Sequence, residues 1–231
     1  MSNVIVYSLT KGDEMTNTLV YKSVRNLNDV AICMVTENTE AIAKGYNEFL
    51  DHYDIDEYDY AIFCHDDVSI EDANLAEKLD KAIGDDSEFA ICGSAGTSSC
   101  VIKDKCLWHR MHNDIKSLSG AVAHYTDKDD TECFMTNFGP SPKRVIMLDG
   151  LFLAVNIKKV KEAGVRFDES YPSKFHFYDL DFCLEANKAG LKLTTYPIWM
   201  VHKSHGLEDI NNPEWDAGNQ YFKDKWGIKN G

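Results

Sequence analysis

Short apolar runs and helical patterns alternate along the first hundred residues of the chain. The apolar runs predict buried strands at Val4–Tyr7, Asp29–Val35, Tyr60–Cys64 and Phe89–Cys92. Apolar residues at helical spacing predict helices over Glu40–Tyr53 and Leu75–Ile83. This alternation of strand and helix predicts a parallel sheet with helices packed on its faces.

The pattern changes near the middle of the chain and then resumes. Residues 94–144 are rich in Ser, Thr, Gly, Asp and Lys, which predicts a functional flap or an antiparallel excursion. Beyond them, strands are predicted at Val145–Leu148, Leu151–Asn156, Leu191–Tyr196 and Ile198–Val201. Helices are predicted at Ile157–Ala163 and Tyr178–Ala189, and each is followed by a glycine, which is typical of a helix end.

Composition narrows the class of protein. The 231 residues predict one domain, with 24 Lys and Arg against 38 Asp and Glu and a formal net charge of −14. Such acidity argues against nonspecific nucleic-acid binding and against docking on an anionic membrane. No long apolar stretch occurs, so no membrane span is predicted. The seven cysteines form no CxxC pair and no secretory leader pattern opens the chain, so a cytoplasmic location is expected.

The first candidate for chemistry is an acidic group directly after a predicted strand. His65, Asp66 and Asp67 follow the apolar run that ends at Cys64. Ligands of open α/β sheets bind at the carboxyl ends of the strands, and carboxylates there favour a hard divalent cation such as Mg²⁺ or Mn²⁺. A solvated acidic turn would have the same spacing.

The second candidate is a pair of acids at the start of a helix. Asp179 and Asp181 follow three aromatic residues within Phe175–Tyr178. They are either helix-capping groups or a partly desolvated general base, and the spacing alone does not separate these interpretations. Two residues apart on one helix, their side chains point roughly 200° away from each other, so only one of them is expected to face a substrate.

Two weaker signals follow predicted strands in the second half. Asp149-Gly150 combines a strand-end acid with a residue that permits close backbone approach, which by itself indicates only a turn. His202 ends the last predicted strand and His205 follows three residues later. Histidine is a common metal ligand, and the spacing leaves open which of the two would bind an ion.

The order of these four groups resembles the GT-A nucleotide-sugar glycosyltransferases. The resemblance is to their family-2-like and streptococcal-type glycosyltransferase-like members, and it extends roughly from Val4 to Trp226. The segments that carry it are FCHDDV (63–68), LDGLFLAV (148–155), FHFYDLDFCLEANKAG (175–190) and PIWMVHKSHG (197–206). It implies an α/β fold, a GT-A-like three-layer α/β/α sandwich with a mostly parallel central sheet. Residues 1–231 would form one domain, with a nucleotide-binding half up to about residue 100 and an acceptor and catalytic half from about residue 101.

The resemblance also implies roles for single residues. Asp67 matches the metal-binding acid of the DXD motif, although His65 replaces the first acid of that motif and Asp66 stands at its variable position. His202 matches a strand-end histidine that completes the metal site. Asp179 matches the catalytic base of inverting members. The remaining implied roles are a supporting acid at Asp181, a sugar contact at Asp149-Gly150 and a nucleotide-side contact at Asn47.

The expected activity is a Mn²⁺- or Mg²⁺-dependent transfer of a sugar from a nucleotide-sugar, a UDP-sugar in the first instance, to a hydroxyl acceptor such as a glycan. The sequence has no glycine-rich phosphate loop, so the leaving diphosphate would depend on the metal. Two alternatives remain open: a nucleotidyltransferase or nucleotide-sugar hydrolase on a similar sheet, and a non-enzymatic carbohydrate-binding protein.

Overall fold

The computed structural model describes residues 2–101, 105–126, 129–203, 210 and 212–227. A seven-stranded sheet forms its centre. In spatial order the strands are β2 (Val30–Val35), β1 (Val4–Leu9), β3 (Tyr60–Cys64), β11 (Phe152–Asn156), β5 (Ile91–Gly93), β12 (Leu193–Thr195) and β9 (Lys143–Val145). Strands β1, β2 and β3 are parallel, as are β5 and β12, whereas β11 and β9 run antiparallel to their neighbours.

The predicted α/β class is confirmed, and the predicted mostly parallel sheet is a mixed one. The difference arises at β11, which enters the sheet antiparallel between β3 and β5. Its apolar sequence fits a strand buried on both faces in either direction, so periodicity could not reveal its orientation.

Residues 94–144 supply most of a second, six-stranded sheet. Its path is β10 (Met147–Leu148), β6 (Ala95–Thr97), β7 (Leu118–Tyr125), β13 (Met200–His202) and β4 (Val68–Ile70), with β8 (Cys133–Gly139) paired to β7. The contacts of β7 with β6 and β8 are antiparallel, which confirms the predicted antiparallel excursion. Three residues separate the end of β3 from the start of β4, so the 65–67 segment connects the two sheets.

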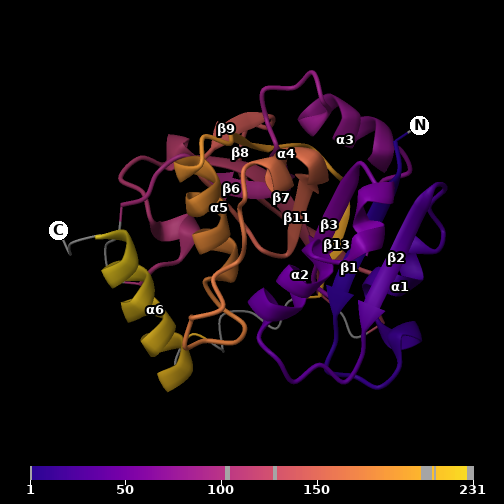
Figure 1. Ribbon diagram of the computed structural model, residues 1–231, viewed down its shortest axis with the longest axis horizontal. Helices are drawn as coiled ribbons and strands as arrows, with labels where there is room; N and C mark the ends of the chain where they lie inside the picture. The colour runs from indigo at the N-terminus through magenta and orange to yellow at the C-terminus, as the bar shows by residue number, and fades with distance from the viewer. Residues whose placement is uncertain (1, 102–104, 127–128, 204–209, 211, 228–231) are drawn as a thin grey trace.

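The helices surround these sheets (Figure 1). They are α1 (Leu19–Val24), α2 (Ile42–Leu50), α3 (Leu75–Ile83), α4 (Ile157–Glu162), α5 (Tyr178–Lys188) and α6 (Pro213–Trp226), with 3₁₀ turns η1 (Met15–Asn17), η2 (Tyr53–Glu57), η3 (Trp108–Arg110) and η4 (Ile115–Ser117). Figure 1 shows α6 at one side of the molecule next to α5. The start of α6 is fixed by Asn212, whose side-chain oxygen accepts a hydrogen bond from the Trp215 amide at 2.8 Å.

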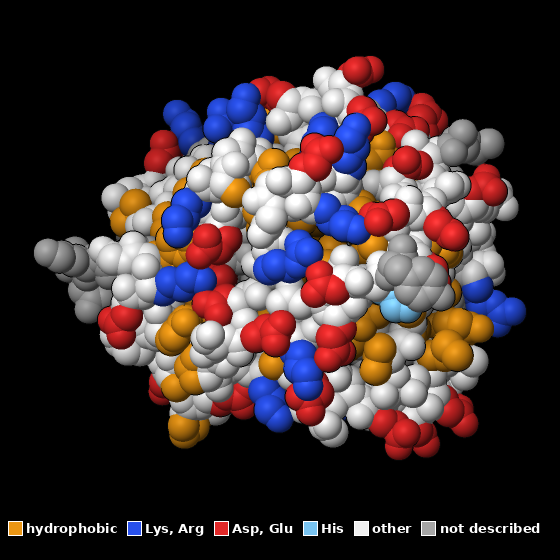
Figure 2. Space-filling view, in the orientation of Figure 1, with side chains coloured by type: hydrophobic (Ala, Val, Ile, Leu, Met, Phe, Trp, Pro, Cys, Tyr) orange, Lys and Arg blue, Asp and Glu red, His pale blue; other side chains and the backbone are white. Residues whose placement is uncertain are grey.

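Aromatic side chains dominate the core beneath the carboxyl ends of β1 and β3. Tyr46 of α2 lies 4.6 Å from Phe63 of β3, and Phe167 stacks on Phe182 of α5 at 4.1 Å between ring centroids. These rings join α2, β3 and α5 and so hold the first turn of α5 against the strand ends. On the surface, basic and acidic side chains intermingle over the face in Figure 2. Within the described residues, no helix combines the length and the apolar character that crossing a membrane requires.

Candidate active site

Two chain segments bring histidine and aspartate side chains together where β3 ends. The turn from β3 into β4 carries His65 and Asp67, and His202 ends β13, which pairs antiparallel with β4 so that His202 lies opposite Val68. Potential ligand atoms of His65, Asp67 and His202 all lie within 4.8 Å of one another. We call these three residues the His-Asp-His cluster.

The Asp67 carboxylate of this cluster is half-buried and forms an ion pair with His202. The pair joins Asp67 Oδ1 and His202 Nε2 at 3.2 Å, and this oxygen is itself buried and has no further partner among the described residues. Burial alone would raise the pKa of Asp67, but the two histidines hold it below its ordinary value. Burial would lower the pKa of His202, but the Asp67 carboxylate raises it overall. For His65, burial prevails and lowers the pKa, which favours the neutral imidazole.

These residues fit a divalent metal ion. Apart from the ion pair with His202, Asp67 Oδ1 has no partner among the described residues, so a metal ion held by both side chains would satisfy it, and a neutral imidazole is a ready metal ligand. Two imidazoles and one carboxylate suit a first-row transition ion such as Mn²⁺ better than Mg²⁺, which prefers oxygen ligands.

Asp179 lies at the start of α5 and faces the Asp149-Gly150 turn. Its Oδ2 accepts a hydrogen bond from the Gly150 amide at 2.9 Å. A Cβ atom added at Gly150 would lie 2.5 Å from the Tyr178 hydroxyl and 2.9 Å from Asp179 Oδ2, so only glycine permits this approach. Burial, and then the negative charge of Asp149, raise the pKa of Asp179 to about 7. Asp179 can therefore exchange a proton near neutral pH.

The backbone that positions Asp179 is strained and supported from behind. Phe177, the residue before α5, has a positive φ of 69°, which is uncommon for a bulky side chain. Its ring packs on Trp215 at 5.2 Å and on Phe222 at 5.9 Å, and Gly218 of the same helix leaves room for it. Helix α6 thus holds the conformation from which α5 begins.

Asp149 is oriented by two donors. Its Oδ2 accepts a hydrogen bond from the Trp108 indole at 2.8 Å, and its Oδ1 accepts one from the Leu151 amide at 3.1 Å. Trp108 comes from the 94–144 segment and was not identified from the sequence, because only the fold brings it to Asp149. Asp149 is therefore fixed beside Asp179 on the same side of α5.

Asp181 points into a different environment, as the helical geometry predicted. It is 0% exposed and bonded to the Tyr171 hydroxyl at 3.0 Å, the Trp226 indole at 2.9 Å and Lys225 at 2.9 Å. These partners anchor α6 to α5. Asp181 thus joins two helices, while Asp179, two residues earlier, faces the Asp149-Gly150 turn.

A hydrogen bond links the His-Asp-His cluster to α5. His65 Nε2 lies 2.7 Å from the Tyr178 hydroxyl, which also donates to the Gly150 carbonyl oxygen at 3.1 Å. The observed contacts make Tyr178 a structural connection between the histidine of one strand end and the helix that carries Asp179.

Two neighbouring cavities meet at His65. The strand-end cavity, of about 440 Å³, is lined by residues that include Thr10, Lys11, Asn38, His65, Asp66 and Asp67. The Asp179 cavity, of about 150 Å³, is lined by residues that include His65, Trp108, Asp149, Gly150, Tyr178 and Asp179. Phe175 and His176 also line both, and Lys11 lies over the Phe175 ring at 4.0 Å. A ligand spanning both cavities would pass the His-Asp-His cluster.

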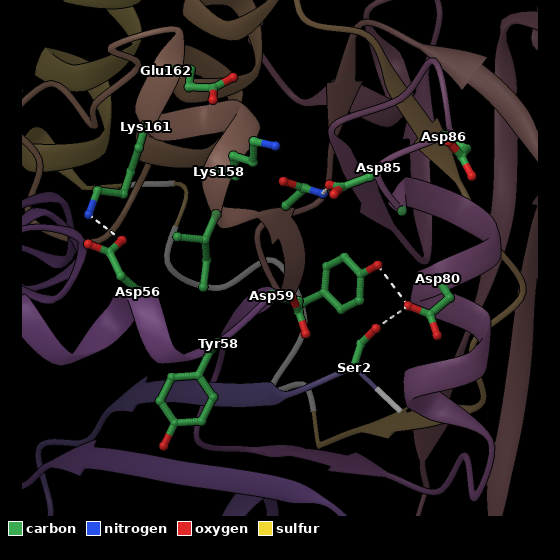
Figure 3. A pocket seen from close by; sticks show the side chains of 14 residues that line it. Ser2, Asp56, Tyr58, Asp59, Asp80, Asp85, Asp86, Lys158, Lys161 and Glu162 are labelled. Carbon is green, nitrogen blue, oxygen red and sulfur yellow. Dashed lines mark hydrogen bonds and ion pairs between the residues drawn. The ribbon is translucent and has the colours of Figure 1, made fainter.

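A larger cavity lies at the other end of the central strands (Figure 3). This opposite cavity, of about 680 Å³, is lined by residues that include Ser2, Asp56, Asp59, Asp80, Asp85 and Lys161. Figure 3 shows Asp56 paired with Lys161, and Asp80 bonded to the hydroxyl of Ser2. Asp80 also accepts a hydrogen bond from the Tyr60 hydroxyl. None of the sequence-predicted site residues that the structure describes lines this cavity.

The remaining predicted residues are placed as follows. Asp66 lines the strand-end cavity, and its backbone oxygen accepts hydrogen bonds from the first residues of α1. The Asn47 amide bridges to the backbone of Phe167 and to Glu169 Oε1, and Asn47 does not line the strand-end cavity. His205 lies outside the described residues.

The chain matches a family model, and part of the chain is similar to a curated protein. The model, described as a glycosyltransferase-like family, matches residues 21–225. The curated protein, "ATP synthase subunits region ORF 6" of Fuscovulum blasticum, is 24% identical over 155 residues, which are 66% of this chain. The chain spans about half of that relative, 54% of its length. The family match confirms the resemblance predicted from the sequence.

Several solved structures are similar in fold at low sequence identity. The catalytic domain of Drosophila β1,4-galactosyltransferase 7, in complex with xylobiose, has a TM-score of 0.44 at 14% identity and covers 84% of this chain and 64% of its own. The structure of S. aureus TarS 1–349 has a TM-score of 0.44 at 12% identity, and the match covers 87% of this chain and 60% of TarS 1–349. CMP:2-keto-3-deoxy-manno-octonic acid synthetase has a TM-score of 0.45 at 11% identity, and the match covers 90% of this chain and 93% of the synthetase. All three TM-scores lie below 0.5.

Proposed function

Because the chain belongs to the glycosyltransferase-like family, we propose that it is a metal-dependent glycosyltransferase that moves a sugar from a UDP-sugar to a hydroxyl acceptor. The observation that carries the proposal is the juxtaposition of the His-Asp-His cluster and Asp179. Burial raises the pKa of Asp179 to about 7. The residue before it, Tyr178, is hydrogen-bonded to His65 of the cluster, in which Asp67 Oδ1 forms an ion pair with His202 and has no other partner among the described residues. Glycosyl transfer needs both a base for the acceptor and positive charge at the leaving diphosphate.

The strand-end cavity is the proposed nucleotide site. It is lined mainly by the first half of the chain, which we assign to nucleotide binding up to about residue 100. Lys11 supplies a positive charge and Thr10 a hydroxyl, and Asp66 is assigned to the donor side. His65, Asp67 and His202 would hold Mn²⁺ or Mg²⁺. When bound, the ion offsets the charge of the departing diphosphate as a Lewis acid.

The Asp179 cavity is the proposed site of transfer, built mainly from residues after about 101. Asp179, held by the Gly150 amide, accepts the proton of the attacking acceptor hydroxyl, which makes the reaction an inverting one. Asp149 is fixed by Trp108 and the Leu151 amide, and its carboxylate binds a sugar hydroxyl. Asp181 acts through structure, because its ion pair with Lys225 fastens α6 behind Phe177. The seven free cysteines fit a reducing compartment, and we assign the cytoplasm.

The test is calorimetric titration of the metal-free protein with UDP, GDP and CDP in EDTA and in MnCl₂ or MgCl₂. We expect UDP to bind only with the metal, and Mn²⁺ to support tighter binding than Mg²⁺. Equal UDP affinity in EDTA and in MnCl₂ would contradict the metal site, and no binding of any nucleotide would favour a carbohydrate-binding protein. Incubation with UDP-sugars then separates transfer from the alternatives, because a nucleotidyltransferase would need a nucleoside triphosphate and a hydrolase would need no acceptor.

A further inference from the structure

One face of the β7–β8 hairpin adjoins the candidate active site and carries an exposed phenylalanine. Strand β7 pairs in parallel with β13, and His124 lies beside His202 in register, with ring centroids 5.8 Å apart. Across the hairpin His124 pairs with Phe134, and the two rings stack at 5.2 Å. A row of rings therefore runs from His65 through His202 and His124 to Phe134.

Strand β8 also reaches the other half of the site. Side chains alternate along a strand, so Phe134 and Thr136 share one face. Phe138 follows at a register shift of the hairpin and packs on Trp108 at 4.7 Å between ring centroids, and Trp108 donates its indole hydrogen bond to Asp149. Strand β8 thus extends from the side of the His-Asp-His cluster to the residue that orients Asp149.

Position along this row separates the acceptor from the donor. The strand-end cavity, proposed for the nucleotide, begins at His65 and extends toward β1. Phe134 lies at the opposite end of the row, beyond His202 and His124. A donor with its diphosphate at the cluster would occupy the first side. The reacting hydroxyl of the acceptor would lie in the Asp179 cavity, which leaves the Phe134 side for the rest of the molecule that receives the sugar.

The chemistry of the face indicates the class of acceptor. Phe134 is 54% exposed, and covering an exposed apolar ring with another apolar surface lowers the free energy of the system. The imidazole of His124 and the hydroxyl of Thr136, on the same face, can each donate or accept a hydrogen bond. A pyranose ring combines an apolar C–H face with hydroxyl groups along its rim, and so matches both kinds of contact.

Resting on the proposed function, we propose that the Phe134 face of the β7–β8 hairpin is the acceptor site and that it takes a pyranoside, whose C–H face stacks on Phe134. Met135 provides a matched control, because it is the next residue on the strand, is also 54% exposed and lies on the opposite face. The variants are therefore Phe134→Ala, Met135→Ala and the conservative Phe134→Trp.

The probes are the methyl α- and β-pyranosides of glucose, galactose, mannose and xylose. Ligand-observed saturation-transfer NMR is recorded with UDP and Mg²⁺, which is diamagnetic. We expect at least one pyranoside to receive saturation mainly on one C–H face. Phe134→Ala should weaken its binding by about threefold to tenfold, as loss of one aromatic contact does. Phe134→Trp and Met135→Ala should bind within about twofold of the unchanged protein on that scale.

The outcomes separate this proposal from the proposed function. Titration with UDP and MnCl₂ is repeated on each variant, and Phe134→Ala should bind UDP normally. If UDP binds but no pyranoside receives saturation, or if Phe134→Ala and Met135→Ala weaken binding equally, the acceptor site is wrong while the transferase proposal stands. If Phe134→Ala loses UDP affinity instead, Phe134 belongs to the donor site and the assignment is overturned.

Discussion

Two acid-lined cavities lie at opposite ends of β1 and β3, and they differ in how their carboxylates are paired. In the opposite cavity, Asp56 pairs with Lys161, Asp80 accepts from Ser2 and Tyr60, and Asp85 accepts from Asn156. At the strand-end cavity, the buried Oδ1 of Asp67 has no hydrogen bond among the described residues. These three acids of the larger cavity thus have partners in the fold, whereas in the smaller cavity Asp67 keeps a buried oxygen whose contact among the described residues is the ion pair with His202.

The difference shows that neither cavity volume nor the number of acids identifies a site in so acidic a chain. Pairing is the better guide, because a buried carboxylate without partners costs free energy that binding can recover. Asp179 is costly to ionise for a different reason. It accepts a backbone hydrogen bond, but burial and then the charge of Asp149 raise its pKa to about 7.

The largest effect is expected for Asp179→Asn. The variant cannot accept a proton, so the transfer rate should fall by about 10²–10⁴-fold, as loss of a general base does. UDP affinity should stay nearly unchanged, because the lost interaction belongs to the transition state. In the unchanged protein the rate should rise with pH up to about 7 and then level off, since the base must be ionised. Steady-state rates between pH 5 and 9 test both statements.

Asp85→Asn is the matched control at the opposite cavity, and it should leave the rate and its pH profile unaltered. A variant at Asp179 that kept the normal rate would show that the base is another group. If the rate of Asp179→Asn fell but the pH profile kept its rise below pH 7, the titrating group would not be Asp179.

The second-largest effect is expected for Asp67→Asn, which should weaken metal-dependent nucleotide binding. Mutation of a residue that only supports a metal ligand typically lowers metal affinity by about 10–100-fold. Loss of Asp67, a ligand itself, should therefore lower UDP affinity in MnCl₂ by at least about the same factor. The change should not unfold the protein, because Asp67 is half-exposed and asparagine keeps an oxygen that can accept from His202. Titration of UDP into the variant, with circular dichroism as a check of folding, gives the answer. Unchanged affinity would remove Asp67 from the metal site.

The sequence predicted the parts of the fold that depend on local pattern. Helix α3 begins and ends as predicted, at Leu75 and Ile83, because its apolar spacing and the following glycine are local signals. The predicted strand Val145–Leu148 instead divides between the two sheets, with β9 beside β12 and β10 beside β6. Which neighbour a residue pairs with depends on contacts far away in the chain, and no periodicity contains that information.

The candidate site was predictable to the same extent. Strand ends placed His65, Asp67 and His202 at one edge, because the carboxyl ends of strands carry the binding residues of α/β sheets. The supporting contacts were not predictable: Trp108 reaches Asp149 across 41 residues, and Lys225 reaches Asp181 across 44. The helix that carries Lys225 had local signals that were overlooked, namely Asn212 as a cap and a proline in the first turn.

A moderate effect on stability is expected for the same Asp179→Asn change. The folded-state pKa of Asp179, about 7, lies above the ordinary value of about 3.9. As pH rises from 4 to 7 the unfolded chain ionises first, so the folded state loses stability over that window and does not regain it above pH 7. Asparagine cannot ionise. A pKa raised from about 3.9 to about 7 corresponds to about 4 kcal/mol of lost stability at pH 8. Because Asp179 is only partly buried, solvent screening reduces this effect, and we expect the variant to be more stable by about 2 kcal/mol.

This stabilisation should disappear at pH 4, where the carboxyl is protonated in both states. Urea unfolding of the metal-free protein at pH 4 and pH 8 measures it. A variant equally stable or less stable than the unchanged protein at pH 8 would show that the folded-state pKa of Asp179 is close to its ordinary value.

The smallest effect is expected at the opposite cavity, from Asp56→Asn. Asp56 pairs with Lys161 at 2.6 Å, but its side chain is 66% exposed, so solvent screens the ion pair. Exposed pairs of this kind contribute about 0.2–1 kcal/mol, and the variant should lose no more than that in urea unfolding. UDP affinity in MnCl₂ should not change, because Asp56 lies at the far end of the strands from His65. A loss of UDP affinity as large as that of Asp67→Asn would place the nucleotide in the opposite cavity, and would mean that acid pairing does not distinguish the two ends of the sheet.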